Sequence, residues 1–155
     1  MTSEQELEQE GEIAADFIEE FLDVADLDGD LEIEFRQDRV YISVTSDEES
    51  NLGTVSKPET VEALQELARL AVQSKTGEMS RLILDVGGSR AAKTEQLKKL
   101  VERSIEKLEE TDKEQHLKPM SSYDRKQVHD MVGEAGYVSE SEGVGKERHI
   151  VIRKP

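Results

Sequence analysis

Two stretches decide the fold of the last part of the chain: PMSSYDRKQVHDMV at residues 119–132 and YVSESEGVGKERHIVIRKP at residues 137–155. Pro119 and the serine pair that begins at Ser121 are typical of a helix start, and the helix is expected to run to about Glu134. The second stretch has two strand-like segments around a glycine-rich turn, which predicts a β-hairpin.

Arg125 and His129 are the candidate functional residues of this helix. They are four positions apart, so both side chains lie on one helix face, with Tyr123 and Lys126 nearby. A guanidinium beside an imidazole offers donors for phosphate oxygens and flat surfaces for stacking bases, which single-stranded nucleic acid requires. Arg and His at this spacing are also common on solvated helices, so the spacing alone does not decide the function.

Upstream of this region, the hydrophobic pattern predicts a mixed architecture. The expected elements are a helix over about 13–25, a hairpin of strands at 31–35 and 40–44, a helix over about 58–73, a strand at 81–86 and a helix over 90–110. Ser56 and Glu59 have the spacing of a capping box for the second helix. The order is α-β-β-α-β followed by α-α-β-β, an α+β chain that divides near Gly87-Gly88.

Charge is distributed unevenly along the chain. The 36 acidic and 20 basic residues give a net charge of −16, yet residues 1–30 hold 12 of the acids and no lysine or arginine. From residue 79 onward acids and bases nearly balance, so a local basic surface is compatible with the composition. The acidic stretch is interpreted as a solubilising segment, with a partner-binding tail as the alternative.

No apolar run approaches the ~18 residues that a membrane span needs, and there is no cysteine for disulfides or thiolate ligands. A cytoplasmic protein without membrane insertion is therefore expected.

No catalytic or metal-binding constellation is evident, and no cofactor is indicated. The three histidines lack the spacing of the known histidine metal motifs. Asp26, Asp28 and Asp30 begin like a calcium loop, but the glycine and the final glutamate that such a loop needs are absent. Asp85 is a candidate catalytic carboxylate or, as the favoured alternative, the cap of the Gly-Gly turn. An enzyme is therefore not expected.

The C-terminal helix and hairpin resemble an R-three-H domain, a family named for its Arg-x-x-x-His motif. The likeness extends over the helix with Arg125 and His129, the SESEG segment and the basic last strand. In that family the module binds single-stranded nucleic acid. The resemblance therefore implies that Arg125 and His129 contact the nucleic acid.

Residues 59–90, ETVEALQELARLAVQSKTGEMSRLILDVGGSR, resemble the type II KH domain of the bacterial Jag family (SpoIIIJ-associated proteins, also called KhpB). That family joins a KH domain directly to a C-terminal R-three-H domain, and the acidic N-terminus resembles its actinobacterial branch. The acidic composition predicts a disordered N-terminus at 1–12. The resemblance implies a type II KH-like domain at 13–87 and an R-three-H domain at 88–155.

The KH-like region departs from its family in the loop that would hold RNA. A KH domain clamps about four nucleotides with a GxxG loop before a helix. Here the segment before the helix is Val55-Ser56-Lys57-Pro58, with neither glycine, and an acidic loop at Asp47–Ser50 lies close by in sequence. Ser56 and Lys57 remain candidate phosphate contacts, so the loop is interpreted as a degenerate clamp that binds RNA weakly.

Taken with the family resemblance, the sequence predicts a non-enzymatic single-stranded RNA-binding protein that acts after transcription. The candidate contacts are Arg125, His129, Lys126, Tyr123, Arg148, Arg153 and Lys154, with Ser56 and Lys57 in the KH-like region. The resemblance links such proteins to bacterial cell elongation and division, with a smaller KH protein as a candidate partner. The alternative function is a protein-interaction adaptor whose RNA binding has weakened.

Overall fold

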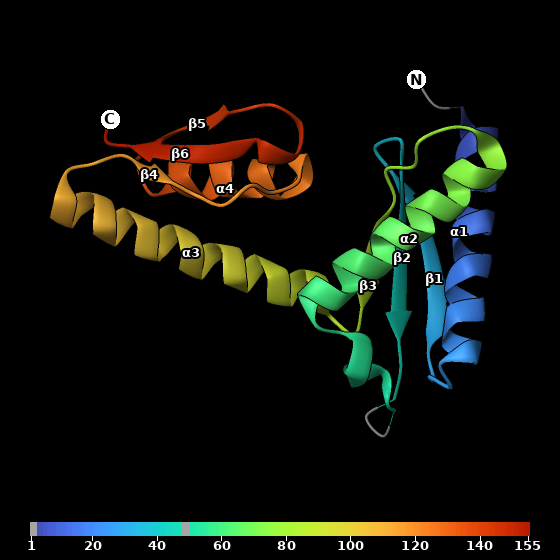
Figure 1. Cartoon of the computed structure of the whole chain (residues 1–155). Coiled ribbons are helices and arrows are strands. Elements are labelled where there is room, and N and C mark those ends of the chain that lie inside the picture. The colour runs from blue at the N-terminus through green and yellow to red at the C-terminus, as the bar shows by residue number, and fades with distance from the viewer. Residues whose placement is uncertain (1–2, 48–49) are drawn as a thin grey trace. The chain divides into compact units, whose positions relative to one another are not determined.

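The computed structural model describes residues 3–47 and 50–155, and the chain divides into two compact units, Met1–Ala92 and Lys93–Pro155 (Figure 1). Both units mix helices and strands, which confirms the α+β class. Within the described ranges, no helix is long and apolar enough to cross a membrane. Residues 1–2 of the expected disordered segment and residues 48–49 of the acidic loop lie outside the described residues.

The first helix, α1 (Glu4–Val24), corrects the prediction of a disordered N-terminus, which is helical from Glu4 onward. The Ser3 hydroxyl accepts a hydrogen bond from the Glu6 backbone N–H at 3.1 Å, and the Glu6 carboxylate accepts one from the Ser3 N–H at 3.2 Å. This capping box starts the helix. Burial of Leu7 then anchors the first turns in the core, so the acidic composition does not prevent folding here.

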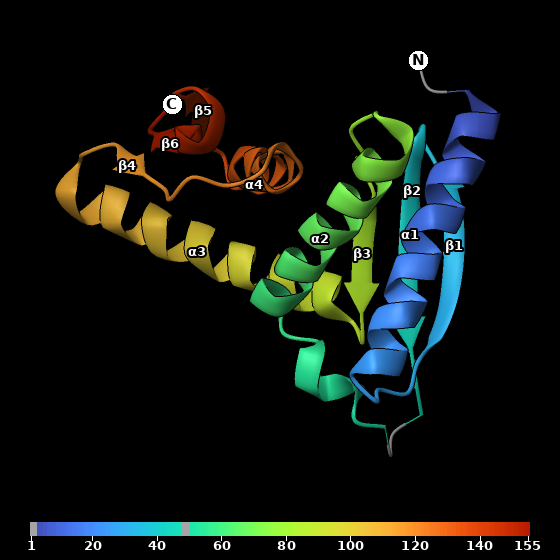
Figure 2. The same ribbon diagram turned by 45° about the vertical axis from the view of Figure 1, so that its right-hand side comes forward.

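A three-stranded sheet covered on one face by two helices makes the first unit (Figure 2). β1 (Asp30–Arg36) pairs antiparallel with β2 (Arg39–Thr45), which pairs in parallel with β3 (Ile83–Val86). α1 and α2 (Pro58–Thr76) pack against this sheet. The two-residue period of β2 puts its apolar side chains on the helix-covered face. They are Val40, Ile42 and Val44, which are all buried.

The acidic segment between α1 and β1 is a helix-to-strand turn. The sequence favours this interpretation over a calcium loop. The Asn51 side chain donates to the Asp26 carbonyl at 2.7 Å and accepts from the Asp28 N–H at 3.1 Å. The Ser50 hydroxyl donates to the Asp28 carbonyl at 3.0 Å. Side chains from a distant loop therefore hold this turn.

The start of α2 differs from the prediction. Its N-cap is Lys57, without a side-chain cap bond, and Pro58 occupies the first turn. The Ser56 hydroxyl instead donates to the Gly53 carbonyl at 3.2 Å, within the short 3-10 helix η1 (Leu52–Val55) and its end. The predicted capping box is therefore wrong. The helix starts one residue later than predicted, and the Ser56 hydroxyl bonds to η1 instead of to the first turn of α2.

Asp85 at the end of β3 caps the next helix, α3 (Ser89–Thr111). Its carboxylate accepts hydrogen bonds from the Ser89 hydroxyl at 3.2 Å and from the Arg90 backbone N–H at 3.1 Å. Both glycines between the strand and the helix have positive φ, a conformation that glycine adopts without steric cost. The structure confirms the capping interpretation of Asp85.

The second unit packs α3 and α4 (Ser122–Glu134) against an antiparallel sheet of order β4-β6-β5. The strands are β4 (Gln115–His116), β5 (Val138–Glu142) and β6 (His149–Arg153), with a 3-10 turn η2 (Gly145–Glu147) before β6. The buried side chains of this core are Leu97, Val101, Leu108, Leu117, Val128, Val132, Ile150 and Ile152. The strand β4 lies in the polar segment between the two predicted helices. The sequence does not indicate it, because two residues are too few to show the alternation of a strand.

Candidate nucleic-acid interface

α4 carries the Arg-x-x-x-His pair on the flank beside β5 and β6. The Ser121 hydroxyl accepts a hydrogen bond from the Asp124 N–H at 3.2 Å, so Ser121 is the N-cap and the predicted helix start is confirmed. Val128 is fully buried and orients the helix. Arg125 and His129 are both half-buried at the margin of this buried face.

Both ring nitrogens of His129 are bound by hydroxyl groups of β5. Nδ1 lies 2.7 Å from Ser139 Oγ, and Nε2 lies 2.9 Å from Ser141 Oγ. A serine hydroxyl donates and accepts, so the pair of bonds suits either tautomer of the imidazole. His129 therefore fastens the hairpin to α4 and has no ring nitrogen without a partner. The signal in the sequence is the S-E-S-E alternation, which puts both serines on one face of β5.

Arg125 is linked to the last strand through the backbone of Met120. Its Nη1 donates to the Met120 carbonyl at 3.4 Å, and the Met120 N–H donates to the Arg148 carbonyl at 3.4 Å. The Arg148 guanidinium donates to the Gly143 carbonyl at 2.9 Å. In the described part of the chain, neither guanidinium has a carboxylate within ion-pair distance. Both groups therefore keep donors for phosphate oxygens.

Tyr123 and Lys126 are three residues apart on α4 and differ in burial. Lys126 is exposed and follows Arg125 around the helix. Tyr123 is half-buried and precedes by four residues Gln127, whose side chain accepts a hydrogen bond from Thr94 of α3 at 3.1 Å. By helical spacing, Tyr123 therefore shares the flank that faces α3 rather than the flank of Arg125.

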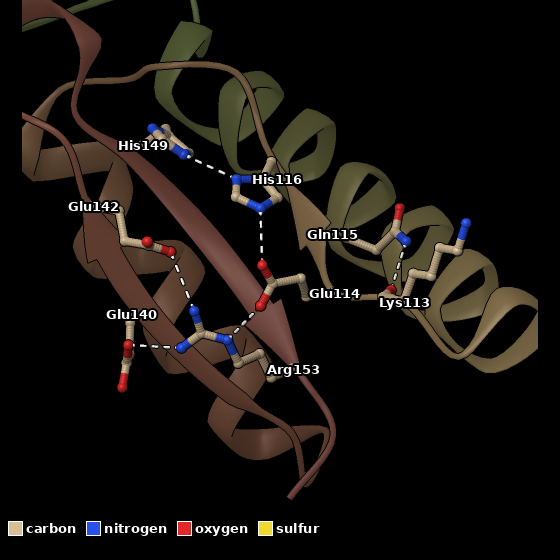
Figure 3. A network of polar contacts seen from close by, with 8 residues as sticks. All are labelled: Lys113, Glu114, Gln115, His116, Glu140, Glu142, His149 and Arg153. Carbon is tan, nitrogen blue, oxygen red and sulfur yellow. Dashed lines mark hydrogen bonds and ion pairs between the residues drawn. The ribbon is translucent and has the colours of Figure 1, made fainter.

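Arg153 lies on the outer face of the sheet and is surrounded by carboxylates (Figure 3). Its guanidinium is 2.6 Å from Glu114, 2.7 Å from Glu140 and 3.3 Å from Glu142. The two glutamates of β5 alternate with the serines that hold His129, so they project from the opposite face. The hydrogen bonds that Arg153 donates to Glu114 and to Glu140 raise the pKa of Arg153 above its usual value. These carboxylates compete with any phosphate for the guanidinium.

Lys154 is also bound by acids. Its Nζ is 2.6 Å from Asp112 and 3.7 Å from Glu109. The hydrogen bond between Asp112 and Lys154 lowers the pKa of the carboxyl and raises the pKa of the ammonium. Both side chains are exposed, so the pair adds little stability. It does reduce the positive charge at the end of the last strand.

Ser56 and Lys57 belong to the first unit, at the start of α2. The Ser56 hydroxyl is engaged by the Gly53 carbonyl, whereas the Lys57 side chain is exposed. The loop borders an open depression of about 450 Å³ whose described lining includes Asp47 and no lysine or arginine. The loop therefore has little positive charge with which to hold a phosphate, and the expected contacts at Ser56 and Lys57 stay predictions.

The Glu114–Arg153 pair makes the stability of the second unit sensitive to acid. The hydrogen bond from Arg153, with a second one from His116, holds the pKa of Glu114 below its ordinary 4.5. Because the unfolded chain then takes up this proton at higher pH, the stabilisation is present above about pH 4.5 and is lost as the pH falls further. We expect Glu114→Gln to lower the melting temperature at neutral pH slightly and to flatten its fall between about pH 5 and 3.

The measurement is a series of thermal melts followed by circular dichroism. Glu102→Gln on the exposed side of α3 is the matched control, since it removes one carboxylate outside this network. A parallel acid response in wild type and Glu114→Gln would contradict the expectation.

Comparisons with known proteins relate the second unit to a domain family and most of the chain to two RNA-binding proteins. The R-three-H domain family matches residues 95–154. The RNA-binding protein KhpB of Clostridium symbiosum is 25% identical over 141 residues, which are 90% of this chain and 64% of that protein. The RNA-binding protein KhpB of Bacillus subtilis (strain 168) is 31% identical over 99 residues, or 61% of this chain and 47% of that protein. The chain thus spans about half to two thirds of the length of these relatives.

The R-three-H match lies wholly inside the second unit and includes Arg125, His129 and the hairpin. The first relative matches over nearly the whole chain, so the likeness extends into the first unit. These findings agree with the resemblance read from the Arg-x-x-x-His helix and its hairpin. An R-three-H domain occupies residues 95–154, and the likeness to the two KhpB proteins supports an assignment to the Jag family.

Proposed function

We propose that this protein binds single-stranded RNA through the flank of α4 that carries Arg125 and His129. Both relatives are named RNA-binding proteins, and the R-three-H match includes this flank. The observation that carries the proposal is that three cations of the matched region, Arg125, Lys126 and Arg148, have no ion-pair partner among the described residues. In a chain with a net charge of −16, such a set leaves a local positive surface for phosphates.

Three other cations of the second unit, Lys93, Arg153 and Lys154, offer a contrast. Lys93 lies 3.8 Å from Asp124, and Arg153 and Lys154 are each held by two or more carboxylates. Carboxylates therefore bind the cations on and near the outer face of the sheet, whereas Arg125, Lys126 and Arg148 have no ion-pair partner among the described residues. This distribution supports an anionic ligand at the flank.

Each residue of the flank has a role in the proposal. Arg125 and Arg148 present planar donor groups to phosphates or base edges, and Lys126 adds charge. His129 holds β5 in place through its two serine bonds. Arg153, with Lys154, contributes less than expected from the sequence, because carboxylates already bind both.

The first unit contributes less to RNA affinity in this proposal, since the loop before α2 lacks the GxxG glycines. Residual contacts there would come from the exposed Lys57 and from Ser56. The protein would act in the cytoplasm after transcription and without enzymatic activity. A role in cell elongation and division, with a smaller KH protein as partner, rests on the family resemblance alone.

Affinity for single-stranded RNA is expected to fall as salt rises. Three cations that contact phosphate would give a slope of about −2 in a plot of log affinity against log salt, at ~0.7 per contact. Fluorescence anisotropy with a labelled RNA of ~12 nucleotides, between about 50 and 200 mM KCl, measures this slope. Absence of binding at the lowest salt concentration would contradict the proposed function.

A protein-interaction adaptor is the second candidate, and one feature of α2 favours it. Leu67 and Leu70 are 53% and 51% exposed and lie on one side of the helix. An adaptor would bind no RNA at low salt and would lose its protein partner on Leu67→Ser with Leu70→Ser. Steep salt dependence with an unchanged RNA affinity in this double variant favours the RNA-binding function instead.

A further inference from the structure

Two histidines face each other on the outer face of the second sheet (Figure 3). His116 of β4 and His149 of β6 are 33 residues apart in sequence, yet His116 Nδ1 lies 3.1 Å from His149 Nε2. Their strands pair in antiparallel register, so the backbone holds the two side chains together. The contact depends on β4, and no spacing motif in the sequence indicates it.

The hydrogen bonds of the two rings fix where their protons lie. The other nitrogen of His116, Nε2, is 3.2 Å from a Glu114 carboxylate oxygen. The other nitrogen of His149, Nδ1, is 3.0 Å from the Glu147 backbone carbonyl. A carboxylate and a carbonyl only accept, so both of these nitrogens carry hydrogen. In two neutral rings, the facing nitrogens then both hold lone pairs, which repel each other unless a cation lies between them.

The distance between the facing nitrogens suits two ligands of one metal ion. Nitrogens at about 2.05 Å from Zn²⁺ and 3.1 Å from each other subtend about 98° at the ion. That angle lies between square-planar and tetrahedral coordination. Histidines that bind metals usually donate their second N–H to a carboxylate or a backbone carbonyl, which is the arrangement found here.

The surrounding charges also favour a cation. Glu114, Glu140 and Glu142 share this face with a single guanidinium, that of Arg153, so three negative charges and one positive charge leave −2. A divalent ion bound by two neutral imidazoles would balance this charge.

We propose that His116 and His149 form a two-histidine site for Zn²⁺ or a similar divalent transition metal ion. Glu114 and the Glu147 carbonyl orient the two rings, and the remaining coordination positions are open to water or to a donor from outside. A bound ion would fasten the two-residue strand β4 to β6. Because the site lies on the sheet face opposite to the serines that hold His129, it does not depend on the proposed RNA-binding function.

The test is a titration of Zn²⁺ alone into the full chain, freed of metal with EDTA. We expect one ion per chain by calorimetry and a rise in melting temperature of a few degrees that EDTA reverses. His116→Asn and His149→Asn should each abolish both effects, and Glu114→Gln should weaken binding about tenfold, as is usual for such outer hydrogen bonds. Lys113→Ala, on the same connector, is the matched control and should bind zinc like wild type.

NMR of the imidazole nitrogens provides an internal check on the position of the ion. Zinc should shift the resonances of His116 and His149 and leave those of His129, whose nitrogens are both held by serines, unchanged. Equal zinc affinity in wild type and in a folded His149→Asn variant would overturn the proposal. Resonances that respond to pH but not to zinc would also overturn it, because the cation between the rings would then be only a proton.

Discussion

Replacing Arg125 by alanine is expected to lower the affinity for single-stranded RNA by about tenfold or more, without lowering stability. An arginine that contacts phosphate or a base edge contributes ~1–3 kcal/mol to binding, and about 1.4 kcal/mol corresponds to a factor of ten. Within the described residues, its hydrogen bond to the Met120 carbonyl is long, at 3.4 Å, so the fold loses little when the side chain is removed. Anisotropy titration measures the affinity, and thermal melting measures the stability.

Two further variants separate a specific contact from a general effect of charge. Arg125→Lys keeps the charge but loses the planar fork, so an intermediate affinity is expected. Arg103→Ala removes the same charge from the exposed side of α3, and a loss of about twofold or less is expected. Equal losses for Arg125→Ala and Arg103→Ala would show that only net charge matters.

Replacing His129 by alanine is expected to destabilise the second unit by ~1–3 kcal/mol, since two half-buried hydroxyl groups lose their partner. For a unit of this size, each kcal/mol lowers the melting temperature by about 4–8 °C. Circular dichroism measures the shift, and hydrogen exchange should place the loss of protection in β5 and β6. Lys126→Ala on the same helix should change stability by less than about 0.5 kcal/mol.

Variants of the two serines that bind His129 distinguish a positioning role of this residue from direct contact with RNA. The double variant Ser139→Ala with Ser141→Ala keeps the His129 side chain but removes both of its hydrogen bonds. If His129 acts by holding β5, this double variant should lose as much RNA affinity as His129→Ala, and the combined triple variant should lose no more. A normal RNA affinity in the serine variant would instead assign His129 to direct contact.

Several parts of the fold follow from local patterns. The expected helix over 90–110 is observed as Ser89–Thr111, because the apolar period along it is regular and a capping aspartate precedes it. The helix α4 begins at its serine N-cap as predicted. The N-terminus was open to the same reasoning, since Ser3 and Glu6 have the capping-box spacing, but acidic composition outweighed that short signal.

The exposure of two leucines on α2 shows that local sequence patterns do not predict which apolar side chains are buried. The helical spacing of α2 suggests an apolar stripe that includes Leu67 and Leu70, yet both are half exposed. A two-layer unit with one sheet face covered can bury only one side of each helix. How wide the buried stripe becomes depends on the neighbouring helix, which the periodicity of one segment does not describe.

The candidate site divides in the same way. The four-residue spacing of Arg125 and His129 is a property of any helix, so the sequence alone could place both on one flank and could relate them to an R-three-H domain. It could not show that His129 is held by two serines while Arg125 has no acidic partner among the described residues. Those facts depend on strand register, which brings β5 against α4 and turns its glutamates to the far face toward Arg153. Hydrogen bonds and ion pairs act over a few ångströms in space, and only the tertiary structure decides which distant residues come that close.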